Sequence, residues 1–310
     1  MTIGIAAFGP SAGQAVLAGL NAVESVGIGE IRGFGVFAAL CPDGTLVRAR
    51  TQRGGGPVLL ADLGRQGQLS QAESATVAAL ISSGPDRPEP LDQFLPGSPA
   101  GLVTGHRLPN TAGRDGVPLN LAVLRRMEAG DAPRGAVPAV IDANPEIDAG
   151  LIAVSQGTLA FAETRRVGRR NDRGQARLDI RDGAAGVAVL HNAIQPFEGL
   201  ALLAAGAARA VLEAALPPLA RFRIEPGITL DLADTDGVWL TADGAVERIG
   251  SANPGHAHYQ GWTSSAVYLG TPVYQHDRRV GVTVGEARCR LDRGRIVEVD
   301  PERSSVIWRA

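Results

Sequence analysis

The stretch "IGIAAFGPSAGQAVLAGLNAVESVG" (residues 3–27) has the pattern of a strand, a turn and a helix. A short apolar run comes first, a glycine and a proline follow it, and apolar residues then recur every three or four positions. Two later stretches have the same order, one over residues 100–130 and one, "AGVAVLHNAIQPFEGLALLAAGAARAVLEAAL", over residues 185–216. We therefore expect three similar strand–helix segments.

Four stretches have the pattern of tight hairpins, in which two short strands flank a turn. They cover residues 34–51, 150–164, 237–249 and 287–299. The first and third carry Asp-Gly at the turn, a pair that favours the positive φ angles of type I′ turns. Hairpins produce antiparallel sheets, so the predicted fold class is α+β, with layered antiparallel sheets and packed helices.

The order strand, helix, hairpin suggests an internal repeat. We expect a single compact domain over residues 1–310, with sub-units at 1–82, 100–182 and 183–310 and a proline-rich, linker-like excursion at 83–99. The copies share few identical residues, so convergent helix and hairpin patterns remain the alternative to a true repeat. The glycine-rich "QRGGGPVLL" (52–60) is interpreted as a flexible turn that leads into a strand.

The composition excludes several chemistries. All 30 basic residues are arginine, so a lysine Schiff base, a Ser-Lys dyad and a phosphate-loop lysine are impossible. No G-x-G-x-x-G sequence follows a strand and opens a helix, and we expect no cofactor. The formal net charge of −2 offers no electrostatic reason to bind nucleic acid or an anionic membrane.

The longest apolar run, residues 199–216, contains Arg209 and Glu213, which predicts a core helix rather than a membrane span. The first residues lack the basic and long apolar regions of a signal peptide, so we expect a cytoplasmic protein with a small-molecule partner. Tyrosines and tryptophans gather within residues 259–274. This enrichment fits a pocket, an interface of a homo-oligomer or a packed sheet.

Polar residues follow the predicted strands, where a site is expected because side chains there stand beside free backbone N–H groups. The second segment offers Thr104, His106, Arg107 and Asn110, the third offers His191 and Asn192, and the first offers Ser11. If these strand ends converge, His106 and His191 become catalytic candidates, and Arg107, Asn110, Asn192 and Ser11 become substrate-binding candidates. The alternative is that each histidine caps a loop. Arg107 or Arg53 would bind a substrate carboxylate through two parallel hydrogen bonds.

The stretch from Leu119 to Thr164 has two predicted helices followed by a hairpin that ends in a strand of small residues. This pattern resembles N-terminal-nucleophile hydrolases, closest to gamma-glutamyltranspeptidases and small bacterial relatives. The resemblance implies a four-layer αββα sandwich and hydrolysis of amide bonds. It also implies an N-terminal Thr, Ser or Cys nucleophile whose own α-amine is the base.

Two threonines fit that role. Thr2 follows Met1, and methionine removal before a small residue would expose its amine, whereas a retained methionine would block it. Thr104 would need cleavage after Val103. The alternative for Thr2 is an ordinary residue of a first strand.

A metal site is a further alternative. In an extended "HAHYQ", His256 and His258 share one face, and His276 lies nearby in sequence. Zinc needs a third ligand at the right distance, and the same residues also fit a loop.

Three hypotheses follow. The first is an amidohydrolase that acts on a small amide or lactam bearing a carboxylate. The second is a non-enzymatic protein of three similar units that binds a small anion. The third is a metal-dependent hydrolase.

Overall fold

The computed structural model describes residues 1–181, 183–216, 220–263 and 267–309. The chain divides into two compact units, Met1–Leu216 and the part from residue 217 onward. The expected single domain is therefore wrong. Each unit buries its own apolar core, because the strands after residue 219 pack against one another and form a separate cluster around Val238, Val273 and Ile296.

The first unit contains a six-stranded sheet, called sheet A here, in which all neighbours are antiparallel. Its strand order is β3-β2-β4-β1-β10-β9. The bounds are β1 (Thr2–Phe8), β2 (Gly35–Leu40), β3 (Leu46–Thr51), β4 (Val77–Ser83), β9 (Arg173–Ile180) and β10 (Ala185–Asn192). β1 therefore occupies a central position with a partner on each side.

A second sheet, sheet C, has the order β5-β6-β7-β8 and packs on sheet A. Its strands are β5 (Gly97–Ser98), β6 (Gly101–Arg107), β7 (Ala149–Ser155) and β8 (Thr158–Glu163). A short 3-10 helix, η1 (Leu91–Phe94), precedes it.

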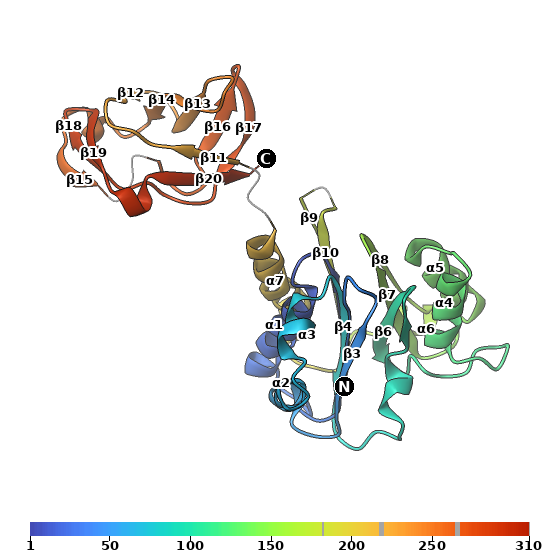
Figure 1. The fold of residues 1–310 in the computed structure, drawn as a ribbon. Coiled ribbons are helices and arrows are strands. Elements are labelled where there is room, and N and C mark those ends of the chain that lie inside the picture. The colour runs from blue at the N-terminus through green and yellow to red at the C-terminus, as the bar shows by residue number, and fades with distance from the viewer. Residues whose placement is uncertain (182, 217–219, 264–266, 310) are drawn as a thin grey trace. The chain divides into compact units, whose positions relative to one another are not determined.

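Helices cover the outer face of each sheet, as Figure 1 shows. Sheet A carries α1 (Ala12–Val26), α2 (Gly55–Arg65), α3 (Leu69–Ser74) and α7 (Phe197–Ala215), and sheet C carries α4 (Leu119–Glu128) and α5 (Pro133–Ala143). The short α6 (Arg165–Gly168) follows β8. The predicted α+β class and its αββα-like layers are confirmed in this unit.

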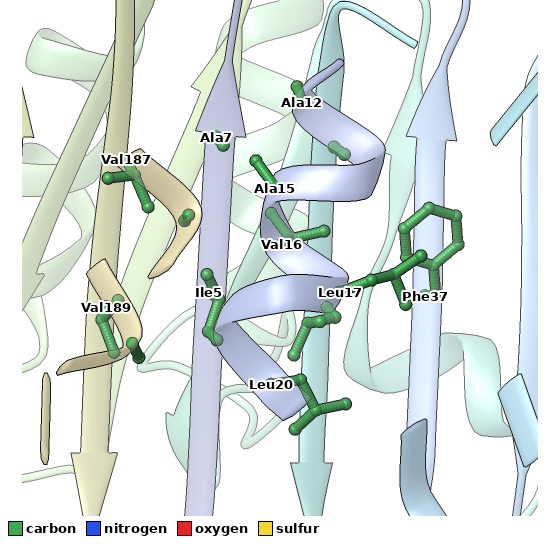
Figure 2. Close-up of a cluster of buried hydrophobic side chains, with 14 of the residues drawn as sticks. Ile5, Ala7, Ala12, Ala15, Val16, Leu17, Leu20, Phe37, Val187 and Val189 are labelled. Carbon is green, nitrogen blue, oxygen red and sulfur yellow. The ribbon is translucent and has the colours of Figure 1, made fainter. Parts of the chain in front are cut away.

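Side-chain alternation on β1 divides the core into layers. Ile3, Ile5 and Ala7 pack toward the helices, whereas Ala6 and Phe8 belong to the cluster between the sheets. Figure 2 shows the helix-side layer, in which Val16 and Leu20 of α1 belong to the same cluster as Ile5 of β1, Val187 and Val189 of β10 and Phe37 of β2.

The two sheets approach each other closely at Gly4 and Gly105. A Cβ atom on Gly4 of β1 would lie 2.4 Å from the carbonyl oxygen of Gly105 in β6. Real side chains do not tolerate such a distance, so a glycine at position 4 is what allows the two backbones to touch. This contact lies two residues from Thr2, on the same face of β1.

The local patterns are confirmed. All four hairpins form, and the turn glycines Gly44, Gly157, Gly244 and Gly294 have φ between 72° and 86°. The predicted helix over residues 199–216 is α7, which packs on sheet A through Leu200, Ala204 and Leu212. Among the described residues, no helix combines the length and apolar character that crossing a membrane requires.

Two expectations about the chain's organisation are wrong. The excursion at 83–99 lies inside the first unit, and residues 185–192 pair with β1, so 1–82, 100–182 and 183–310 are not separate sub-units. The stretch 52–60 leads into helix α2, not a strand. Its first turn is stabilised by Glu24, whose carboxylate accepts hydrogen bonds from the Gly56 N–H at 3.0 and 3.2 Å.

The second unit is built from strands and two 3-10 helices, η2 (Pro254–Ala257) and η3 (Pro301–Arg303), in its described part. A seven-stranded sheet has the order β11-β20-β17-β16-β13-β14-β12, and a three-stranded sheet has the order β15-β18-β19. The bounds are β11 (Ala220–Arg223), β12 (Leu230–Leu232), β13 (Gly237–Leu240), β14 (Val246–Ser251), β15 (Gln260–Thr263), β16 (Pro272–Gln275), β17 (Arg278–Thr283), β18 (Cys289–Asp292), β19 (Arg295–Val299) and β20 (Ser305–Arg309).

We predict that Gly4→Ala lowers the free energy of unfolding of the first unit by about 1–3 kcal/mol, because the added methyl group forces the sheets apart. Urea denaturation followed by circular dichroism measures the loss. The matched control is Gly206→Ala on the exposed face of α7, where a Cβ meets nothing within 4 Å. That change should stabilise by up to about 1 kcal/mol. Equal stability of Gly4→Ala and wild type would contradict the proposed sheet contact.

Candidate functional site

Thr2 begins the central strand at one end of sheet A, and its side chain faces the space between the sheets. This orientation follows from alternation, since Ala6 and Phe8 of the same strand belong to the inter-sheet cluster. The side chain is buried, with 4% of the residue exposed. Within the described part of the chain its hydroxyl has no hydrogen-bond partner. A free hydroxyl at a strand end is available for chemistry.

The neighbours of Thr2 on this face are polar. Thr2 pairs with Ser83 of β4 on one side and Asn192 of β10 on the other. Asn192 in turn pairs with Arg173 of β9. Cross-strand partners have Cβ atoms about 4.5–5.5 Å apart. Ser83, Thr2, Asn192 and Arg173 therefore form a row across four strands at the end of sheet A.

Asn192, a member of that row, has a buried side-chain amide without hydrogen-bond partners in the part of the chain that the structure describes. It is 5% exposed, and its Oδ1 atom has no hydrogen-bond partner in the described residues. No hydrogen bond engages its Nδ2 group there either. A buried amide without partners is costly, which makes it a candidate to bind a ligand's polar atoms.

Sheet C faces this row with a histidine and a carboxylate. His106 Nε2 lies 3.0 Å from Glu163 Oε1, although the angles miss hydrogen-bond geometry. Gly150 lies between them, and a Cβ there would come within 2.3 Å of His106 Nε2. The other oxygen of Glu163 accepts a hydrogen bond from Arg173 of sheet A. This buried group joins the two sheets.

Two arginines lie near the start of the chain. Arg87 donates from Nε to Ser83 Oγ at 2.9 Å, and among the described residues no carboxylate pairs with its guanidinium group. Arg107, by contrast, has two carboxylate partners: its Nε lies 2.5 Å from Asp148 Oδ1, and its Nη1 lies 3.7 Å from Asp172 Oδ2. Arg87 is thus the better placed of the two to receive an external carboxylate.

The amine at the start of the chain is perturbed by these groups. Burial is the main cause that lowers the pKa of the Met1 amine below its ordinary value of 8.0, and the positive charges of Arg87 and Arg107 lower it further. Glu30 and Asp172 act in the opposite direction. An amine with a lowered pKa is unprotonated in a larger fraction of the molecules at neutral pH, and only the unprotonated form can accept a proton.

His191 does not share the space that His106 occupies. Val187 and Val189 of β10 pack toward the helices, so His191 has the same orientation, and a Cβ on its partner Gly174 would lie 2.2 Å from His191 Nε2. His106 faces the space between the sheets instead. The expected convergence of the two imidazoles is therefore wrong. His191 is adjacent to Asn192 in β10, and adjacent residues of a strand point to opposite faces, so only Asn192 faces the space between the sheets.

Most other predicted residues have partners of their own. The Thr104 hydroxyl donates to the Leu80 carbonyl oxygen at 2.8 Å. Asn110 donates to Gln93 Oε1 at 2.8 Å and lines a surface cavity of about 450 Å³ at the edge of sheet C. Arg53 forms an exposed ion pair with Asp86.

Ser11 lies at the opposite end of sheet A from Thr2. β1 and β10 are antiparallel, so Phe8, close to Ser11, pairs with Gly186, whereas Thr2 pairs with Asn192. The expectation that Ser11 joins His191 at one site is wrong for this reason. Of the strand-end candidates, the structure thus gathers Thr2, His106, Arg107 and Asn192.

The histidines of the second unit are not arranged as a metal site. His256 is buried, with Nδ1 2.9 Å from Ser251 Oγ and Nε2 3.3 Å from the Tyr268 hydroxyl. His258 is exposed. Within the described ranges, no group of three or more His, Cys, Asp or Glu side chains is arranged to hold a metal ion.

Sequence reasoning missed Ser83, Arg87, Glu163 and Arg173. Ser83 and Arg87 lie in a stretch that was interpreted as a linker. Glu163 ends a predicted hairpin strand and is two residues from Phe161, so the alternation of side chains predicts that both point to the same face of the sheet. No sequence pattern predicts that Arg173 of the other sheet is its partner.

We predict that His191 makes stability depend on pH. Burial is the main cause that lowers its pKa from 6.5 to about 4, His106 adds to the shift, and a backbone contact with Phe197 and the charge of Glu163 oppose it. Because the unfolded chain takes up this proton below pH 6.5 and the folded chain only near pH 4, stability is complete above pH 6.5 and falls as the pH falls.

Urea denaturation at pH 7.5 and pH 5 measures this effect. The wild type should lose about 2 kcal/mol more than His191→Gln over that interval. The substitution also removes the charge interaction between His191 and His106, so the difference between the two proteins includes that coupling. Identical pH dependence in the two proteins would show that His191 is not buried as a neutral group.

Comparison with known protein families divides the chain as the structure does. The family described as "Domain of unknown function (DUF7259)" matches residues 227–304, within the second unit. No curated protein matches the chain. The family described as "Domain of unknown function (DUF6963)" matches residues 2–221, more than two thirds of the chain, beginning at Thr2 and covering the whole αββα unit. The chain belongs to this DUF6963 family.

Proposed function

We propose that this protein is an amidohydrolase of the N-terminal-nucleophile type, with Thr2 as nucleophile and a small amide or lactam bearing a carboxylate as substrate. The observation that carries the proposal is the position of Thr2. It begins the central strand of an αββα sandwich and directs an unpartnered hydroxyl into the space between the sheets.

The mechanism requires cleavage of the peptide bond before Thr2, which frees the Thr2 amine. The amine takes the proton of Thr2 Oγ while Oγ attacks the substrate carbonyl carbon. The tetrahedral intermediate then collapses, the C–N bond breaks, and the amine passes the proton to the leaving nitrogen. Water attacks the resulting ester in the same way, which releases the acid and restores the hydroxyl.

The surroundings support each step. Burial, and then the charges of Arg87 and Arg107, lower the pKa of the Met1 amine, and we expect the same influences to act on a Thr2 amine one residue further along. Asn192, directly opposite Thr2 in the register, has an amide group free to donate to the oxygen that becomes negative. These steps use only groups of the chain itself.

Two further groups have defined parts in the proposal. Arg87 would bind the substrate carboxylate, because its guanidinium group is held by Ser83 and has no internal acid to neutralise it. The His106–Glu163–Arg173 group would act as a brace between the sheets rather than touch the substrate. Thr104 is less suited to be the nucleophile, because its hydroxyl already donates to Leu80.

We predict that Thr2→Ala abolishes amide hydrolysis, with a fall in kcat of about a thousandfold or more. Thr2→Ser should retain measurable activity, since it keeps a hydroxyl and an amine. A set of N-acyl amino acids and lactams, followed by release of the free amine, provides the assay. Intact mass of the active protein should show that nothing precedes Thr2.

Three results would count against the proposal. They are full activity of Thr2→Ala, activity in protein that retains Met1, and the absence of turnover for every amide in protein that has lost it. Binding of a small anion without turnover, seen as a raised melting temperature, would favour the non-enzymatic alternative.

We predict that Arg87→Gln raises KM for carboxylate-bearing amides by about tenfold to a hundredfold, the effect of losing one charged hydrogen-bonded pair. The KM for a matched amide whose carboxylate is replaced by a carboxamide should not change. The control is Arg126→Gln, in an exposed ion pair with Asp131 on the outer helix layer. Equal KM shifts for both substrates would show that Arg87 does not bind the carboxylate.

A further inference from the structure

The first unit has a cavity of about 450 Å³ that is lined by residues of β3, η1, β5 and α4 and of the loop before α4. Its volume lies within the range of small-molecule pockets, which is about 300–1,000 Å³. Arg48 and Asp92 are the charged residues in its lining. We call this space the Arg48 cavity.

The Arg48 cavity is separate from the Thr2 site. Arg48 lies on β3 at the edge of sheet A, and strands β2 and β4 stand between β3 and β1. Neighbouring strands are about 4.8 Å apart, so roughly 14 Å of sheet separates Arg48 from the strand of Thr2. None of the residues with a part in the proposed reaction lines the cavity.

Arg48 provides the cavity with a group that binds anions. Its Nη1 donates to the Leu95 carbonyl oxygen at 2.9 Å, which holds the side chain in place. Its Nε and Nη2 have no acceptor among the described residues. These two N–H groups form the edge of a guanidinium that binds both oxygens of a carboxylate. The same edge of Arg170 binds Asp172 in this way, with distances of 3.0 and 3.1 Å.

The positive charge of Arg48 is only partly compensated. Asp92 Oδ1 lies 3.5 Å from Arg48 Nη1, but it also accepts a hydrogen bond from Arg50 Nε at 2.6 Å. Two guanidinium groups thus share one carboxylate. Burial lowers the pKa of Arg48, Asp92 opposes the shift and Arg50 adds to it. A second carboxylate beside Arg48 would therefore be favourable.

The other walls of the cavity are largely apolar. Leu121 and Leu124 of α4 line it, together with Pro96 and Pro118. Proline has a fixed backbone angle and no N–H group, so these positions give the wall a rigid shape without hydrogen-bond donors. Apolar ligand surface that is buried against such a wall leaves water with a gain in free energy.

Hydrogen bonds between the walls hold the cavity open. The buried Asn120 of α4 donates from Nδ2 to the Gln93 carbonyl oxygen at 2.8 Å. Asn110, in the loop before α4, donates to Gln93 Oε1 at 2.8 Å. Both contacts tie the α4 side of the cavity to η1. A cavity that is formed before the ligand arrives binds at a lower cost in ordering.

We infer that the Arg48 cavity is a second binding site, for a small monocarboxylate with an apolar body. The carboxylate accepts hydrogen bonds from Nε and Nη2 of Arg48. The apolar body packs against Leu121, Leu124 and the prolines. This site is independent of the reaction proposed at Thr2, and its ligand takes no part in that reaction.

Calorimetry with the full chain tests the inference with three probes. Phenylacetate has the charge and the apolar body, phenylacetamide has the same shape without the charge, and acetate has the charge alone. Phenylacetate should bind about tenfold or more tightly than either, because one probe loses a charged hydrogen-bonded pair and the other a buried ring. No measurable binding of phenylacetate, or equal affinity for phenylacetate and phenylacetamide, would overturn the inference.

Two arginine variants locate the carboxylate. Arg48→Gln should reduce the preference for phenylacetate over phenylacetamide to about one, while phenylacetamide still binds, which shows that the variant folds and keeps its cavity. Arg87→Gln, which removes the guanidinium group beside Ser83, should keep the full preference. A preference that survives in Arg48→Gln, or one that is lost in Arg87→Gln, would overturn the assignment to the Arg48 cavity.

A third variant tests the apolar wall. Leu121→Ala should weaken the binding of phenylacetate and phenylacetamide alike, by about threefold to tenfold, because less apolar surface is buried. The control is Arg126→Gln on the same helix, in an exposed ion pair with Asp131, which should change neither affinity. Unchanged binding of both probes in Leu121→Ala would show that the apolar body lies elsewhere and would overturn the inference.

Discussion

The backbone contact between Gly4 and Gly105 sets the distance between the two sheets, and the candidate site depends on that distance. Thr2 lies on the same face of β1 as Gly4, so the distance between the sheets at Gly4 determines how much space surrounds the Thr2 hydroxyl. A larger residue at position 4 would separate Thr2 from the groups on sheet C. The Glu163–Arg173 ion pair has the same dependence, because its two partners come from different sheets. A close approach of two strands thus brings the polar groups of sheet C near those of sheet A.

The end of the sandwich around Thr2 costs free energy to fold, because polar groups are buried there. Charged and amide groups that are buried without full hydrogen bonding cost free energy, and this end contains His106, Glu163 and Asn192 with unpartnered atoms. The inter-sheet core away from this end is apolar, with residues such as Phe8, Ile152 and Leu190. A protein that needed only a stable sandwich would continue that apolar core to the end. The concentration of under-bonded groups around Thr2 is therefore what makes this end the candidate site.

Local signals made much of the fold predictable, whereas distant contacts did not. Asp-Gly pairs specify hairpins within a few residues, so 34–51 and 237–249 were assigned correctly. Helix α2 was not predicted, because the N–H group of its second residue, Gly56, is bound by Glu24, which is distant in sequence. The site followed the same rule. His106 was identified from a strand end and Thr2 from the family resemblance, but Arg87 becomes significant only through Ser83, whose pairing with Thr2 no local pattern reveals.

The prediction that Ser11 and His191 meet at one site failed for one geometric reason. Three segments with the order strand then helix suggest parallel strands, whose ends meet at one edge of a sheet, but every strand of sheet A is antiparallel to its neighbours. The start of β1 therefore meets the end of β10, and the residue that joins Asn192 is the first of its strand rather than the residue after its last. An antiparallel central strand places the beginning of the chain at the site. In a parallel sheet of the same segments, the start of this strand would lie at the opposite edge from the polar residues that follow the strand ends.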